Sequence, residues 1–308
     1  MKNVKPSFGK VLKRHWLLLL MLLPAVIYVV IFSYIPMTGI VMAFEKYTYK
    51  GGIYGSPWVG FDNFKTLLLS GKLGMVTRNT FLYNVAFIVF GLIFEVGAAI
   101  LLNEIFSKVF KKVAQSIMFL PHFISWVVAG AIMYNLFNYE KGVFNHFLQL
   151  FRLNPVDIYN TPAAWPVILV ILKLWKSVGY GSVIYLAAIT GMDQEMFEAA
   201  AIDGASAWQK IRYLTLPSLV PTMITMSLLA VGNIFRGDFG LFYQTVKSSV
   251  ILQPATEIID TYIFKLLIGT GDVGVSAASG LFQSVLCFFT IMTVNAVVKK
   301  INPDYALF

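Results

Sequence analysis

Six apolar stretches dominate this sequence and restrict what it can fold into. They cover residues 16–35, 79–102, 117–137, 165–191, 218–235 and 276–298. A helix rises 1.5 Å per residue, so about 20 apolar residues cross the roughly 30 Å hydrocarbon core of a bilayer. Charged residues make up 13% of the chain, well below the roughly 25% of soluble domains. The sequence therefore predicts an all-α integral membrane protein with six transmembrane helices.

The first stretch has the outline of a signal peptide, because basic residues precede it. Its apolar core is too long for that, and no small-x-small cleavage site follows it. We therefore expect an uncleaved first helix, preceded by a basic segment over residues 1–15.

The basic residues also predict which ends of the spans face the cytoplasm. With the amino terminus inside, the inside segments are 1–15, 103–116, 193–217 and 299–308. Lys and Arg are about twice as dense there as in the outside segments 36–78, 138–164 and 236–275. Both termini are thus predicted to be cytoplasmic, flanking a transmembrane domain over residues 16–298. The formal net charge of +9 needs no nucleic acid partner on this interpretation.

Several motifs resemble catalytic or cofactor sequences, but their surroundings argue against those functions. GTGDVG at 269–274 fits the G-x-G-x-x-G pattern, yet it precedes a membrane span and lacks the acidic residue expected about 20 positions on. DFG at 238–240 stands without the other kinase motifs. The three histidines are far apart and the chain has one cysteine. We predict no catalytic residue and no metal site, and since no phosphate-binding loop is present, any ATPase must be another chain.

Polar side chains within the apolar stretches suggest a path through the membrane. Glu95, Lys173 and Lys176 are ionisable, and ionisable groups are costly in lipid unless they face protein or water. Each one alone could instead serve helix packing or reach towards the membrane surface. Together they favour a polar path, and aromatic rings in the fourth span could stack on sugar rings. The candidate residues are Asn84, Glu95, Trp175, Tyr185, Asn233 and Gln283.

The segment 193–217 predicts a helix–turn–helix on the cytoplasmic side. Asp193 can cap a first helix, and a run of alanines keeps one face of that helix low. Gly204 permits a turn that other residues resist. Ser206 can cap a second helix, and Pro217 is well placed to begin the next span.

This segment resembles the EAA loop of the membrane subunits of bacterial ABC importers. The sequence reads Glu-Ala-Ala, three residues, glycine, nine residues, then Leu214-Thr215-Leu216-Pro217, with leucine where the family often has isoleucine at position 214. The resemblance implies a type I ABC importer permease fold, with a coupling loop that docks into a cleft of the ATPase. The residues that carry this role by resemblance are Glu198, Ala199, Ala200, Asp203, Gly204, Leu216 and Pro217.

VGFDNFKTLL, MFLPHFISWVVAG and NIFRGDFGLFYQ are similar to segments of the carbohydrate-uptake group, closest to its polysaccharide or complex-oligosaccharide type. The resemblance implies a multi-pass permease of the bacterial cell membrane, not an enzyme, which moves an oligosaccharide inward by alternating access. It implies three kinds of partner: a second homologous permease, likewise in the membrane and forming a heterodimer; two cytoplasmic ATPase subunits; and an external solute-binding protein. ATP and magnesium would be held by the ATPase, and no cofactor by this chain. An importer of a non-sugar solute and an ion-coupled secondary transporter remain alternatives.

Overall fold

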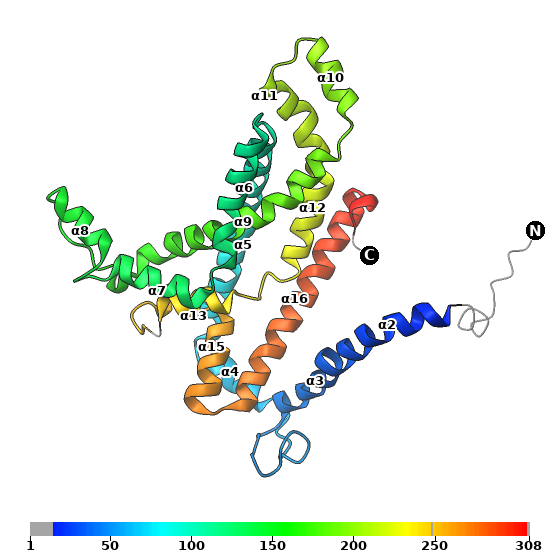
Figure 1. The fold of residues 1–308 in the computed structure, drawn as a ribbon. Coiled ribbons are helices and arrows are strands. Elements are labelled where there is room, and N and C mark those ends of the chain that lie inside the picture. The colour runs from blue at the N-terminus through cyan, green and yellow to red at the C-terminus, as the bar shows by residue number, and fades with distance from the viewer. Residues whose placement is uncertain (1–14, 248, 307–308) are drawn as a thin grey trace, which may run out of the picture.

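The computed structural model describes residues 15–247 and 249–306, which form helices joined by loops (Figure 1). Residues 1–14 of the predicted basic segment lie outside the described residues. The helices are α2 (Trp16–Val29), α3 (Ile35–Met37), α4 (Asp62–Leu69), α5 (Leu73–Asn103), α6 (Lys108–Phe123), α7 (Trp126–Phe137), α8 (Val143–Leu150), α9 (Trp165–Thr190), α10 (Gln194–Ile202), α11 (Ala207–Lys210), α12 (Leu216–Val231), α13 (Phe239–Val246), α14 (Gln253–Thr256), α15 (Ile259–Lys265) and α16 (Val273–Ile301). Within the described residues, β pairing is limited to one isolated antiparallel bridge, between Glu45 and Trp58.

Five continuous helices are long and apolar enough to cross a membrane. They run over Trp16–Phe44, Leu73–Asn103, Pro162–Thr190, Ala207–Val231 and Val273–Ile301. Each contains most of one predicted apolar stretch. The largest shift concerns the stretch 218–235, because its helix begins at Ala207 and ends at Val231, where the chain turns. Pro217 therefore lies inside a continuous helix instead of beginning it.

The remaining stretch, predicted as one span over 117–137, is broken. Helices α6 and α7 meet at an angle of 94°. The side chain of Ser125 accepts a hydrogen bond from the Val128 N–H and so caps a new helix at the break. On the other side of the break, the Lys176 ammonium donates to the carbonyl oxygens of His122 at 2.7 Å and Ile124. A donor from α9 thus satisfies carbonyl groups that a straight helix would have bonded internally.

Two prolines coincide with local changes in helix winding. Pro36 and Pro217 each follow a π-helical turn, over Val30–Tyr34 and Ile211–Thr215. Proline has no N–H to donate, and its ring displaces the carbonyl four residues earlier. The wider turn accommodates the proline, so both helices continue through it.

The centre of the fold is the pairing of α5 with α9, against which α6, α12 and α13 pack. Close approach depends on small residues, since a Cβ at Gly179 would overlap the carbonyl oxygen of Met118 in α6. The helix Trp16–Phe44 stands apart from this bundle along most of its length (Figure 1). Its last segment, Thr38–Phe44, returns to pack on α16. Helices α10 and α11 project at one end of the bundle, and α4 and α15 lie towards the other (Figure 1).

Candidate functional site

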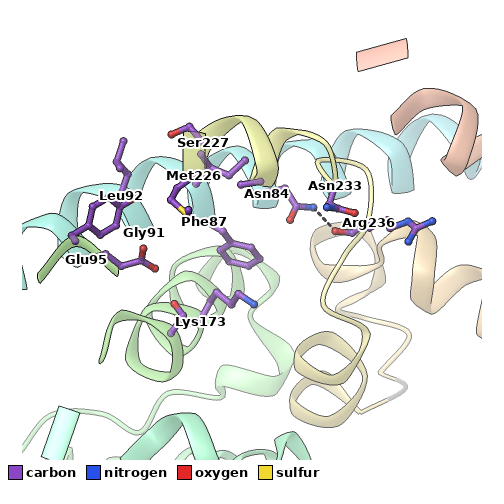
Figure 2. Close-up of a pocket in the computed structure, with 14 residues that line it drawn as sticks. Asn84, Phe87, Gly91, Leu92, Glu95, Lys173, Met226, Ser227, Asn233 and Arg236 are labelled. Atoms are coloured by element: carbon purple, nitrogen blue, oxygen red, sulfur yellow. Dashed lines mark hydrogen bonds between the residues drawn. The ribbon is translucent and has the colours of Figure 1, made fainter. Parts of the chain in front are cut away.

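A cavity of about 300 Å³, lined by both polar and apolar side chains, lies between α5, α9 and α12. Four of the six candidate path residues line it: Asn84, Glu95, Tyr185 and Asn233. Figure 2 shows Asn84 and Asn233 near one end of the cavity and Glu95 near the other. The remaining lining residues are Phe87, Ile88, Gly91, Leu92, Lys173, Ser177, Met226, Ser227, Ala230 and Arg236. Polar groups and aromatic rings on three membrane helices thus surround one space.

The position of Glu95 depends on a glycine in the neighbouring helix. A Cβ at Gly181 would overlap the carboxyl group of Glu95, and Gly91 also lies close, with its ideal Cβ position 3.8 Å from Oε1. No hydrogen bond reaches the Glu95 carboxylate from another residue that the structure describes. Its capacity to accept hydrogen bonds therefore remains available to molecules in the cavity.

Lys173 joins the cavity wall to the DFG segment that follows α12. Its Nζ lies 2.8 Å from Asp238 Oδ2, and its ammonium lies 5.9 Å from the centroid of the Phe87 ring. The other oxygen of Asp238 accepts a hydrogen bond from the Leu241 N–H and caps α13. Gly240 packs on Trp126, since its Cβ would lie 2.5 Å from Trp126 Cδ1. Asp238 therefore caps α13 and pairs with Lys173, and Gly240 allows α13 to pack on Trp126.

The segment that carries Asn233 and Arg236 is fixed by a buried network. Gln283 in α16 donates to the carbonyl oxygen of Phe235 at 2.7 Å and to Asp260 Oδ2 at 3.0 Å. The same Asp260 oxygen accepts from the Gly237 N–H at 2.7 Å. Burial raises the pKa of Asp260, and these hydrogen bonds oppose the rise. Gln283 thus holds the cavity wall from behind and does not line the cavity.

Trp175 also lies elsewhere than expected. Its side chain is 42% exposed and lines an apolar groove with Phe94 and Ile117. On α9, Lys173 and Ser177 line the cavity between α5, α9 and α12 instead. The sequence signalled Lys173 as a charge at membrane depth, but Phe87, Ser177 and Ser227 carried no signal that separated them from ordinary packing residues.

The predicted helix–turn–helix at residues 193–217 is present at the projecting end of the bundle. Asp193 caps α10 by accepting from the Glu195 N–H at 3.0 Å. Gly204 adopts a φ of +79°, a left-handed conformation that favours glycine, and nothing lies within 4 Å of its ideal Cβ. Ser206 and Gln209 form a reciprocal capping box at the start of α11. Glu198, Ala199, Asp203 and Gly204 are all exposed.

Helix α11 continues without a break into the cavity wall. The single helix Ala207–Val231 begins just after the Gly204 turn, and its far end carries Met226, Ser227 and Ala230. Helix α9, another wall of the cavity, leads into α10 through Gly191 and Met192. Helix α10 is therefore connected along the chain to two walls of the cavity.

Residues 87–303 match the family described as binding-protein-dependent transport system inner membrane component. Over 298 residues the chain is 31% identical to protein LplB of Bacillus subtilis, covering 97% of this chain and 93% of the relative. It is 29% identical to the polygalacturonan/rhamnogalacturonan transport system permease protein YteP of the same organism, covering 93% of this chain and 89% of the relative.

A chain of a bacterial ABC transporter that imports the acidic polysaccharide alginate has a similar structure. The TM-score is 0.86 at 31% sequence identity, covering 96% of this chain and 100% of the other. A second structure of a bacterial alginate ABC transporter matches with a TM-score of 0.85 at 31% identity, covering 96% of this chain and 98% of the other. It was solved in complex with a periplasmic protein that holds an alginate pentasaccharide.

Proposed function

The chain belongs to the family of binding-protein-dependent transport system inner membrane components, and we propose that it carries an oligosaccharide through the cavity between α5, α9 and α12. It is a permease subunit of an ABC importer, in which the ATPase is a separate chain. Saccharide as the cargo is supported by the polygalacturonan/rhamnogalacturonan permease and the alginate importer among its relatives.

The chemistry of the cavity fits a sugar. Hydroxyl groups of a saccharide need both donors and acceptors. The amide nitrogen of Asn84 already donates to the carbonyl oxygens of Thr80 and Arg236, so Asn84 offers its oxygen as an acceptor beside Glu95. Asn233 and the Ser227 hydroxyl supply the donors. Phe87 and Tyr185 supply apolar ring surface beside these groups. The cavity in one permease is then one side of a path completed by the second permease.

The continuity of α10, α11 and α12 carries the mechanistic proposal. We place α10 and the Gly204 turn on the cytoplasmic side, where α10 docks into a cleft of the ATPase and Glu198 meets a basic group there. Closure of the ATPase on ATP would then displace α10. Because Ala207–Val231 is one helix, this displacement shifts Met226, Ser227 and Ala230 relative to α5 and changes access to the cavity.

The coupling role can be tested by comparing two glycines with the same backbone strain. Gly204 has a φ of +79° and Gly71 a φ of +69°, and nothing lies within 4 Å of either ideal Cβ position. Both leucine variants strain the backbone by about 1–2 kcal/mol, so strain alone affects them equally. Only Gly204→Leu should uncouple ATP hydrolysis from uptake in proteoliposomes that contain the whole importer. Normal uptake by this variant would contradict the proposal.

Glu198→Lys tests the same contact through charge. We expect uptake to fall roughly tenfold or more, the equivalent of about 1.4 kcal/mol, while membrane insertion stays normal. Glu140→Lys makes the same charge change in the α7–α8 connection and should leave uptake unchanged.

The requirement for ATP separates this mechanism from ion-coupled secondary transport. An ion-coupled transporter would continue to work after ATP depletion with the ion gradient held, whereas this importer should stop.

A further inference from the structure

A second, acidic cavity lies at the end of the molecule opposite to α10. It has a volume of about 580 Å³ and lies between the segment after Phe44, helix α4 and the start of α16. Figure 1 shows α4 beside the beginning of α16 at this end. Three carboxylates line it, those of Glu45, Asp62 and Asp272, with Lys46 as the single basic side chain in the lining. Part of the wall is the GTGDVG motif, to which the transport path assigns no role.

Glu45 is the unusual member of this set. It is 5% exposed, and its Oε2 atom makes no hydrogen bond within the described residues. Lys46 lines the same cavity but forms no ion pair with it in the described part of the chain. The other buried glutamate, Glu257, also has an Oε2 atom without a hydrogen bond, but the Lys265 ammonium lies 2.8 Å from its Oε1 atom, so of these two only Glu45 lacks an ion pair among the described residues.

The two exposed carboxylates already have partners. Asp62 pairs with Lys65 at 3.0 Å, and Asp272 accepts from the Val275 N–H to cap α16. The positive end of the α16 dipole lies near the cavity, but a helix terminus compensates only part of a buried charge. Burial of an unpaired carboxylate is costly, so a partner for Glu45 is expected from outside these residues.

The backbone around Glu45 is built to keep it in place. The side-chain amide of Asn63 donates to the carbonyl oxygens of Ala43 at 3.0 Å and Glu45 at 2.9 Å. The last residue of the GTGDVG motif, Gly274, packs directly on this arrangement. A Cβ at Gly274 would lie 2.7 Å from Asn63 Nδ2 and 2.9 Å from the Glu45 carbonyl oxygen. The glycine therefore allows α16 to begin against the strand-like segment that presents Glu45.

We propose that this cavity receives an arginine or lysine side chain of the external solute-binding protein, which pairs with Glu45 when the two proteins dock. The proposal rests on the function above, in which the end opposite to α10 faces outward. A metal ion is a poorer fit, because no group of three His, Cys, Asp or Glu side chains in the described residues could hold one. A guanidinium or an ammonium forms charge-assisted hydrogen bonds with a carboxylate, which are stronger than hydrogen bonds between neutral groups.

Glu45→Gln tests the proposal because it removes the charge and keeps the shape. The experiment uses the whole importer in lipid nanodiscs and the purified binding protein that supports its ATP-driven uptake. We expect the variant to bind this protein at least tenfold more weakly than the wild type. We also expect the unbound variant importer to unfold at a higher temperature, because an unpaired buried charge has been removed. Glu104→Gln removes the same charge from an exposed glutamate at the C-terminal end of α5, outside this cavity, so it is the matched control and should change the affinity less than threefold.

Substitution of basic residues on the binding protein supplies a second test, which does not require the Glu45 variant to fold well. One Lys→Ala or Arg→Ala variant should weaken docking as Glu45→Gln does, and the two changes together should weaken it no further. Unchanged affinity of Glu45→Gln, or full additivity with every basic substitution, would overturn the proposal. If a chelator weakened the docking of the binding protein to the wild type as much as Glu45→Gln does, the partner of Glu45 would be a metal ion and the proposal would be overturned. If the wild type itself showed no ATP-driven uptake, the proposed function would fail instead.

Discussion

Replacing Gly181 by alanine adds one methyl group at the point where α9 meets the Glu95 carboxyl group. The ideal position of that methyl group overlaps the carboxyl carbon and both of its oxygens. Overpacking of this kind costs about 1–3 kcal/mol. The neighbouring atoms belong to the end of a side chain, so Glu95 can swing aside, and the open direction is the cavity. The variant should therefore assemble, lose some stability, and move substrate abnormally.

Two other glycines set the scale for this prediction. Gly280 lies in α16 with nothing within 4 Å of its ideal Cβ position, so Gly280→Ala measures the helix-propensity gain alone, up to about 1 kcal/mol. At Gly179 the added methyl group would overlap the backbone carbonyl of Met118, which cannot swing aside. Gly179→Ala should therefore be the least stable of the three variants.

The decisive measurement is a double-mutant cycle between Gly181→Ala and Glu95→Ala. Removing the Glu95 carboxyl group makes room for the methyl group, so the double variant should recover most of the stability lost in Gly181→Ala. We expect a coupling free energy of about 1–3 kcal/mol, measured from the thermal unfolding of the purified importer and corrected with Gly280→Ala. A coupling below about 0.5 kcal/mol, the level expected for independent sites, would refute the contact.

Two lysines of α9 give further predictions. Lys173→Met should leave Asp238 without its cation and lower the unfolding free energy by about 1–3 kcal/mol. The double variant Lys173→Met/Asp238→Asn should recover part of this loss. Equal stability of the wild type and Lys173→Met in thermal unfolding would contradict the ion pair. Lys176→Met should free the carbonyls of His122 and Ile124 and loosen the bend between α6 and α7. Hydrogen exchange at the Val128 amide, which caps onto Ser125, should then become faster, and unchanged exchange would show that the lysine does not hold the bend.

Local signals in the sequence predicted local structure well. Asp193 and Ser206 cap the helices that they were expected to cap, and Gly204 has the left-handed backbone that its place in the loop predicted. The membrane spans followed from apolar length, because a spanning helix must satisfy its own backbone hydrogen bonds in lipid. These features depend on a few neighbouring residues and therefore leave a direct trace in the sequence.

Features that depend on distant partners were harder to predict. The bend at residues 124–125 is stabilised by Lys176, more than 50 positions away in the chain. Gln283 and Trp175 were expected in the path because of their residue types, but helix rotation places one behind the wall and the other on an apolar face. Rotation about a helix axis is fixed by packing. Helices α16 and α9, which carry Gln283 and Trp175, are apolar around most of their circumference, so periodicity could not reveal it.

The isolation of the helix Trp16–Phe44 has a consequence for the biogenesis of the protein. None of its most apolar 18-residue window is buried inside the chain. A spanning helix closes its own hydrogen bonds, so this segment is stable in lipid before anything packs against it. Membrane insertion of the first helix can then be complete while the rest of the polypeptide is still being synthesised. The inserted helix holds the nascent chain at the bilayer. The later helices can then fold without any change in the position or conformation of this helix.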